Sequence, residues 1–189
     1  PLMVVSATIS TSPTMIYFGQ EVGEAGNENG GFGSHSRTSI FDYVGVPNHQ
    51  RWMNNGKFDG GKLTPPEKSL RDFYKRVLNF TLKSSALVGD FKEIHSDNNT
   101  ITDGYLPEVY SFVRWSDNQK LIVVANFSSS KKSQFELIIP KNIVQKWNLK
   151  NGKYTIVDQL YHKSQLTLKV INGEGKVIID LKPSESFVY

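Results

Sequence analysis

Apolar and polar positions alternate along the second half of the chain. Residues 166–170, for example, place Leu166, Leu168 and Val170 on one face of a strand and polar side chains on the other. Turn signals such as Asn151-Gly152 separate the apolar segments. Segments at this spacing predict an antiparallel β-sandwich of about eight short strands. The predicted strands are 91–95, 109–115, 121–127, 134–139, 154–157, 166–170, 176–181 and 186–189.

A different period marks residues 66–84, which we predict to form a helix. Thr64 suits the N-cap, Pro65 suits the first helical position, and Glu67 completes a capping box. The apolar residues that follow are spaced by three and four and form one face of the helix: Leu70, Phe73, Tyr74, Val77 and Leu78. This helix is therefore expected to pack on one side.

The first 61 residues show less regular patterns. The apolar segment 2–9 is too short to span a bilayer, and it indicates a buried helix or strand. Because this segment starts directly after Pro1, we expect a truncated or processed chain. Residues 13–19 form a continuous apolar run, which predicts a strand buried on both faces, as in parallel sheets. Residues 23–36 contain five glycines and predict a long loop, and 37–61 predict an irregular, aromatic-rich segment.

These patterns predict an α/β part over residues 1–89 and an all-β part over 90–189. The 189 residues are 38% hydrophobic, enough to form a core. The net charge of +4 is spread along the chain, whereas nucleic-acid binders concentrate theirs in a patch. Cysteine is absent, which excludes disulfides and thiolate metal sites, and the four histidines lack metal-ligand spacing.

One group of residues stands out as a candidate binding site. Gln20 and Glu21 directly follow the predicted buried strand, and Arg37 follows the glycine-rich loop. In α/β barrels the active site is built at the carboxyl ends of the strands, where these residues would lie. The alternative is structural, with Glu21 and Arg37 forming a salt bridge that shapes the loop.

The motif Pro13-Thr-Met-Ile-Tyr-Phe-Gly-Gln-Glu-Val-Gly resembles the eighth barrel strand of the α-amylase family, glycoside hydrolase family 13. An arginine after the following loop is also typical, and Arg37 takes that place, although Gly33 stands where better-known amylases carry an aspartate. Residues 84–90 resemble the end of the last barrel helix, and 121–128 a strand of the family's C-terminal sandwich. The resemblance implies that 1–89 end the catalytic (β/α)8 barrel and 90–189 form the C-terminal β-sandwich domain.

The resemblance also implies a function for a longer enzyme. It would hydrolyse α-1,4-glycosidic bonds of α-glucans with retention, and Gln20, Glu21 and Arg37 would bind substrate. The family's nucleophile, acid/base and stabilising carboxylates would precede Pro1, so the chain itself is expected to be inactive, with no catalytic or metal-binding residue of its own. We expect no cofactor here, although the resemblance implies calcium in the longer enzyme. An extracytoplasmic location would suit that enzyme.

The implied partners are the glucan, bound through the longer enzyme, and either the rest of the barrel or a second copy of the chain. We expect no nucleic-acid partner and no membrane span. The alternative function is a non-catalytic carbohydrate-binding sandwich that stacks sugars on Trp115 or Trp147. Exposed tryptophan rings would favour the alternative, whereas the alternation around Trp115 predicts a place in the core.

Overall fold

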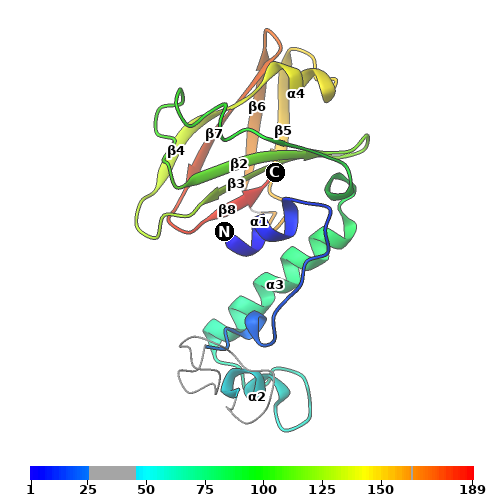
Figure 1. The fold of residues 1–189 in the computed structure, drawn as a ribbon, viewed down its shortest axis with the longest axis vertical. Helices are drawn as coiled ribbons and strands as arrows, with labels where there is room; N and C mark the ends of the chain where they lie inside the picture. The colour runs from blue at the N-terminus through cyan, green and yellow to red at the C-terminus, as the bar shows by residue number, and fades with distance from the viewer. Residues whose placement is uncertain (26–45, 163) are drawn as a thin grey trace. The chain divides into compact units, whose positions relative to one another are not determined.

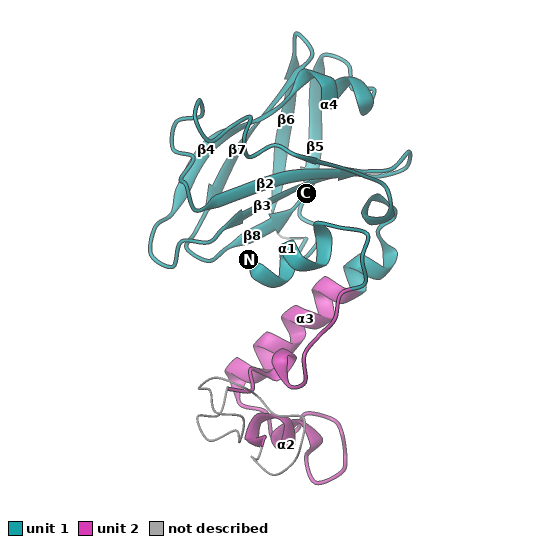
Figure 2. Cartoon of the chain, viewed as in Figure 1, with its two compact units in different colours: residues 1–13, 79–189 teal, residues 14–78 magenta. Residues whose placement is uncertain are grey.

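The computed structural model of the chain describes residues 1–25, 46–162 and 164–189. The chain forms two compact units, coloured separately in Figure 2. The first combines Pro1–Pro13 with Asn79–Tyr189, and the second is Thr14–Leu78. The N-terminal residues thus belong to the same unit as the C-terminal half.

The first unit is built on two antiparallel sheets of four strands each (Figure 1). One sheet has the order β1-β2-β3-β8 and the other β4-β7-β6-β5. Each predicted strand is present within two residues of its expected ends, so the predicted sandwich is confirmed. The strands are β1 (Asp90–Glu93), β2 (Val109–Trp115), β3 (Lys120–Asn126), β4 (Ser133–Ile139), β5 (Gly152–Val157), β6 (Gln165–Ile171), β7 (Glu174–Leu181) and β8 (Ser186–Val188).

The core of this unit lies between the sheets. Along β4 and β7, buried and exposed residues alternate, so one face of that sheet meets water. The strands β2 and β3 differ, because almost all of their residues are buried. Their second face is covered partly by α1 (Leu2–Thr8), which packs against β3 and buries Met3, Val4 and Ala7. Residues 2–9 are therefore a buried helix, one of the two forms expected from their apolar pattern.

Arg114 connects these parts of the first unit. It lies on β2 and is fully buried, and its Nη2 donates to the carbonyls of Leu87, at 2.6 Å, and Gly89, at 3.1 Å. Its Nη1 donates to the carbonyl of Thr8 at 3.4 Å. Burial lowers the pKa of Arg114, and nearby Asp90 opposes that shift. Arg114 thus joins the end of α1 to the 3₁₀ helix η3 (Ser85–Val88) that leads into β1.

A short helix interrupts the second half of the chain. The helix α4 (Lys141–Lys146) follows β4, and we did not predict it because it is brief and follows an apolar strand directly. Ile143 and Val144 anchor it in the core, and Trp147 follows as its C-cap. Burial of two side chains compensates for the weak intrinsic stability of so short a helix.

The helix α3 (Pro65–Lys83) confirms the prediction for residues 66–84. The Glu67 carboxylate accepts a hydrogen bond from the Thr64 backbone N–H at 2.9 Å, as a capping box requires. Tyr74 and Val77, both on the predicted apolar face, are buried. Most of α3 belongs to the second unit, and its last turn to the first.

Two predictions for the first 61 residues are wrong. Residues 13–17 are irregular, and a turn at 18 and 19 leads into the 3₁₀ helix η1 (Gln20–Val22), so residues 13–19 are not a strand. A parallel strand requires at least one parallel partner, and all strand pairs among the described residues are antiparallel. Within 37–61, residues 47–53 form the helix α2 (Pro47–Met53) rather than an irregular segment.

Candidate functional site

The candidate site residue Gln20 opens the helix η1, within the second unit. Gly19 and Gly23 flank η1, and both have left-handed backbone angles, φ 76° and 71°. At Gly19 a Cβ would also lie 2.7 Å from the Cβ of Glu24. The sequence Gly-Gln-Glu-Val-Gly therefore turns the chain tightly because glycine at both ends permits that backbone.

The Gln20 carboxamide is held at both ends. Its Oε1 accepts from the Tyr17 backbone N–H at 3.1 Å, and its Nε2 donates to the Tyr74 hydroxyl at 2.9 Å. Tyr74 is a buried residue of α3. Gln20 thus fixes the turn to α3, and among the described residues the second N–H of its amide has no acceptor.

Glu21 is the less constrained of the two. Its side chain is half-buried, and its carboxylate has no hydrogen-bond or ion-pair partner among the described residues. Arg37 lies outside the described residues, so the expected pairing of Glu21 with Arg37 stays a prediction.

Glu24, which sequence reasoning missed, holds the start of α2. Its carboxylate accepts hydrogen bonds from the backbone N–H groups of Asn48, at 3.0 Å, and His49, at 2.9 Å. These N–H groups lie in the first turn of the helix, where an anion satisfies otherwise unpaired donors. The Asn48 amide donates in return to the carbonyls of Val22 and Gly23. Residues 22–24 and 48–49 are therefore joined side by side.

Arg51 extends this network from α2 to α3. Its guanidinium donates to the Asn48 side chain and makes a bidentate ion pair with the Glu67 carboxylate. These bonds, with that from Thr64, lower the pKa of Glu67 to about 2, and the same ion pair raises the pKa of Arg51. Glu67 thus caps α3 and ties α2 to it.

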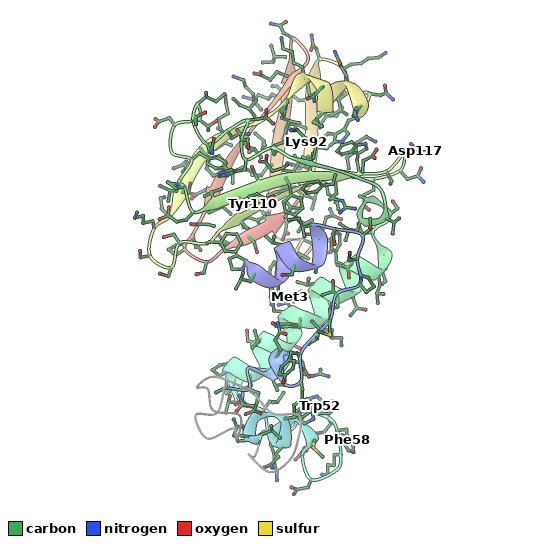
Figure 3. All side chains as sticks on the ribbon, viewed as in Figure 1. Met3, Trp52, Phe58, Lys92, Tyr110 and Asp117 are labelled. Carbon is green, nitrogen blue, oxygen red and sulfur yellow. The ribbon has the colours of Figure 1, made fainter. Side chains whose placement is uncertain are left out.

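Aromatic rings line the same part of the second unit. His49 lies between Phe18, with ring centroids 4.5 Å apart, and Trp52, at 5.5 Å. Trp52 also packs edge-on against Phe58 at 5.8 Å, and both rings are labelled in Figure 3. The Arg71 guanidinium lies 5.2 Å from the Trp52 ring centroid. The aromatic richness of residues 37–61 predicted such packing, whereas Pro47 at the first turn was the overlooked signal for α2.

Among the described residues, this part of the second unit contains a tight turn and a half-buried carboxylate but no pair of carboxyl groups arranged for hydrolysis. Glycoside hydrolysis by retention requires two carboxyl groups, of which the acid has a raised pKa. The pKa of Glu67 is shifted in the opposite direction, and its oxygens are engaged by Arg51 and Thr64.

Two further properties of the described residues bear on ligands and membranes. Within residues 1–25, 46–162 and 164–189, no three His, Asp or Glu side chains are grouped so that they could hold a metal ion. The helices in these ranges are too short or too polar to cross a lipid bilayer.

No protein-family profile matches the chain, and no curated protein matches it either. Solved structures do match. The structure of AmyP in complex with maltose aligns with a TM-score of 0.56 at 18% identity, over 98% of this chain and 32% of that one. The α-amylase from H. orenii aligns with a TM-score of 0.52 at 15% identity, over 98% and 33%. Trehalulose synthase MutB from Pseudomonas mesoacidophila MX-45 aligns with a TM-score of 0.51 at 15% identity, over 100% and 37%.

The chain therefore spans about a third of the length of the solved structures that it matches. Identities this low establish a likeness of fold. The resemblance to α-amylase-type enzymes seen in the sequence motifs is thereby confirmed at the level of fold.

Proposed function

We propose that the chain is the C-terminal part of an α-amylase-type glycoside hydrolase that cleaves α-1,4 bonds in α-glucans. The observation that carries this proposal is the uneven coverage of the structural matches, 98–100% of this chain but only 32–37% of the others. In this proposal the catalytic carboxylates come from the preceding part of the enzyme, and the chain alone is inactive.

We assign residues 1–89 to the end of the catalytic barrel. Side chains in the irregular segment 13–17 support this assignment, because Met15 is 85% exposed and Tyr17 50% exposed. Large apolar side chains at such exposure are expected where a neighbouring element is missing. In the complete barrel, this segment would pair with strands on both sides.

The same exposure predicts self-association when the rest of the barrel is absent. A second copy of the chain could cover the apolar side chains of residues 13–17 that the barrel would otherwise bury. Size-exclusion chromatography with light scattering should therefore show dimers or larger species, and Met15→Ser should reduce them. A monomer at all concentrations would contradict this expectation.

For substrate binding we propose Glu21 and Arg37 as the contacting residues, with Gln20 contributing mainly to their position. The support is the difference in hydrogen bonding, since the Gln20 carboxamide is held by Tyr17 and Tyr74 whereas the Glu21 carboxylate has no partner among the described residues. A carboxylate without a hydrogen-bond partner among the described residues can accept hydrogen bonds from sugar hydroxyls.

The experiment compares the chain with the longer enzyme on maltoheptaose. The purified chain should release no reducing sugar above a blank, and the longer enzyme should. In the longer enzyme, Glu21→Gln should lower kcat/KM by about 10-fold or more, as expected for a lost hydrogen bond to a charged group. Glu136→Gln, on the exposed face of β4, is the matched control and should change nothing. Turnover by the chain itself, or an inactive longer enzyme, would refute the proposed function.

The carbohydrate-binding sandwich gains no support from the two tryptophans proposed as its platforms. Trp115 is 8% exposed and Trp147 is 4% exposed, so neither presents a ring face for a sugar to stack on. The predicted core position of Trp115 is confirmed.

A further inference from the structure

The short helix η1 carries Glu21 between two attachments to other helices of the second unit. At the first residue of η1, the Gln20 carboxamide donates to the hydroxyl of Tyr74 on α3. Just beyond its last residue, the carboxylate of Glu24 accepts hydrogen bonds from the first turn of α2. Glu21 lies between these attachments, and its own carboxylate has no hydrogen-bond partner among the described residues. The turn is thus held at both ends around one unengaged carboxylate.

The backbone couples Glu24 closely to this turn. The Glu24 N–H donates to the carbonyl of Gly19 at 3.0 Å, and the Val22 N–H donates to the same carbonyl at 3.2 Å. A Cβ at Gly19 would lie 2.7 Å from the Cβ of Glu24, so glycine is needed there for the Glu24 side chain to keep its place. Residues 19–24 therefore form one closed turn, and a displacement of Glu24 would move the backbone that carries Glu21.

The start of α2 fastens the same turn from the other side. The first N–H bonded within α2 is that of Gln50, so the N–H groups of Asn48 and His49 need acceptors from outside the helix. Glu24 supplies them at 3.0 and 2.9 Å, and its negative charge suits the positive end of the helix. The Asn48 side-chain amide donates in return to the carbonyls at positions 22 and 23, at 3.1 and 2.9 Å.

These contacts give the two carboxylates of the turn different roles. The Glu24 Oε2 atom accepts two main-chain N–H groups, and such bonds to an ionised group are stronger than those between neutral groups. A sugar hydroxyl would have to displace them in order to bind that oxygen. Glu21 has no comparable contact to give up among the described residues. Glu24 is therefore suited to holding the turn, and Glu21 to contacting a ligand.

We propose that Glu24 is a positioning residue for Glu21, which it serves by holding the end of η1 against α2. This role rests on the proposed function, in which Glu21 contacts the α-glucan. Glu24 does not touch the substrate and acts only through the turn. Its contribution is to order the Glu21 backbone before the glucan binds, so that less conformational freedom is lost on binding.

Hydrogen exchange of the ¹⁵N-labelled chain, followed by nuclear magnetic resonance, tests the attachment itself. Glu24→Ala should make the amides of Asn48 and His49 exchange about 10-fold faster or more and should shift the amide signal of Glu21. Glu24→Gln keeps an acceptor oxygen without the charge and should give smaller changes. Glu21→Ala is the matched control, and its α2 amides should exchange as in the parent chain. Unchanged exchange in Glu24→Ala would overturn the proposal.

A double-mutant cycle in the longer enzyme, with maltoheptaose as substrate, tests the positioning role. Glu24→Ala should lower kcat/KM by about 5-fold or more, mainly by raising KM, because a substrate contact is displaced. In an enzyme that already carries Glu21→Gln, the same change should cause no further loss, because the contact is already weakened. Glu185→Ala is the control, since it removes a carboxylate bond to the Lys182 backbone N–H in an exposed turn and should leave both constants unchanged.

The outcomes distinguish this proposal from the proposed function. If Glu21→Gln lowers kcat/KM but Glu24→Ala does not, or if the two losses multiply in the double variant, Glu24 does not act through Glu21 and the positioning role is wrong. An inactive longer enzyme, or one unaffected by Glu21→Gln, would instead refute the proposed function, and the positioning role with it.

Discussion

At the scale of single residues, a few side chains and glycines determine how distant segments meet. The Arg114 guanidinium donates hydrogen bonds to three backbone carbonyls at the ends of short helices, those of Thr8, Leu87 and Gly89. Asn98 acts similarly, since its buried amide bonds the backbone of Ile94 and both backbone groups of Ile138. Buried polar groups of this kind stabilise one arrangement because any other leaves them unpaired.

Gly104 permits a close approach that another residue would prevent. Its φ is +78°, and a Cβ there would lie 2.1 Å from the Gln134 carbonyl oxygen. Gly104→Ala should therefore lower the free energy of unfolding well beyond the cost of a left-handed backbone, about 1–2 kcal/mol. Gly173 is the matched control, because its φ is also +78° but nothing lies within 4 Å of the added Cβ. Equal losses for the two variants in urea denaturation would contradict the role of the close approach.

At the scale of elements, the alternation of apolar and polar residues predicts the strands, and the capping residues predict where α3 begins. The strand β4 shows the first effect clearly, with Leu137 fully buried and registered opposite Val177 of β7. The helix α3 shows the second, because the Glu67 carboxylate accepts the Thr64 backbone N–H, the half of the capping box that Glu67 supplies. Both signals act over a few residues and do not depend on the rest of the fold.

Leu137→Ala tests the burial of β4. Removing a fully buried leucine side chain should destabilise the chain by about 2–5 kcal/mol. Ile178→Ala, on neighbouring β7 with 59% of the residue exposed, should cost far less. The measurement is the urea midpoint at constant m-value. A Leu137→Ala variant as stable as the parent would show that the register of β4 is wrong.

Glu67 makes the attachment of α2 to α3 dependent on pH. Its pKa is lowered from 4.5 to about 2 by the ion pair with Arg51, so the carboxylate is charged in the folded chain over most of the acidic range. The stabilisation is fully present above pH 4.5 and is lost as the pH falls towards 2. Protection of the α2 amides from hydrogen exchange should decrease over this window. Glu67→Gln should remove the pH dependence, and an unchanged profile in that variant would contradict the role of Glu67.

At the scale of the whole molecule, the sandwich unit draws on both ends of the chain. The helix α1 covers part of the sheet that contains β2 and β3, although about a hundred residues separate it from them in sequence. The two compact units of the structure are residues 1–13 with 79–189, and residues 14–78. The predicted domain boundary at residue 89 instead separates the barrel from the sandwich domain of the longer enzyme, and it stays a prediction.

Truncation tests this dependence on α1. A chain of residues 90–189 keeps Arg114 but lacks the carbonyls of Thr8, Leu87 and Gly89 that accept its hydrogen bonds. It should be less stable than the full chain, because it loses the apolar contacts of α1 and the hydrogen bonds of Arg114. In the full chain Arg114→Met should cost about 3 kcal/mol, and in residues 90–189 much less. The same loss in both backgrounds would show that other groups hold Arg114.

The sequence by itself determined the eight strands, the helix α3 and the core position of Trp115, because periodicity and capping are local consequences of side-chain chemistry. It also carried the motif that pointed to the amylase fold. Only the tertiary structure decided that residues 13–19 form no strand, because a strand exists only where another strand pairs with it. Tertiary structure likewise revealed the network of Glu24, Asn48 and Arg51. This network joins segments far apart in the chain, and no local pattern encodes which distant backbone a side chain will meet.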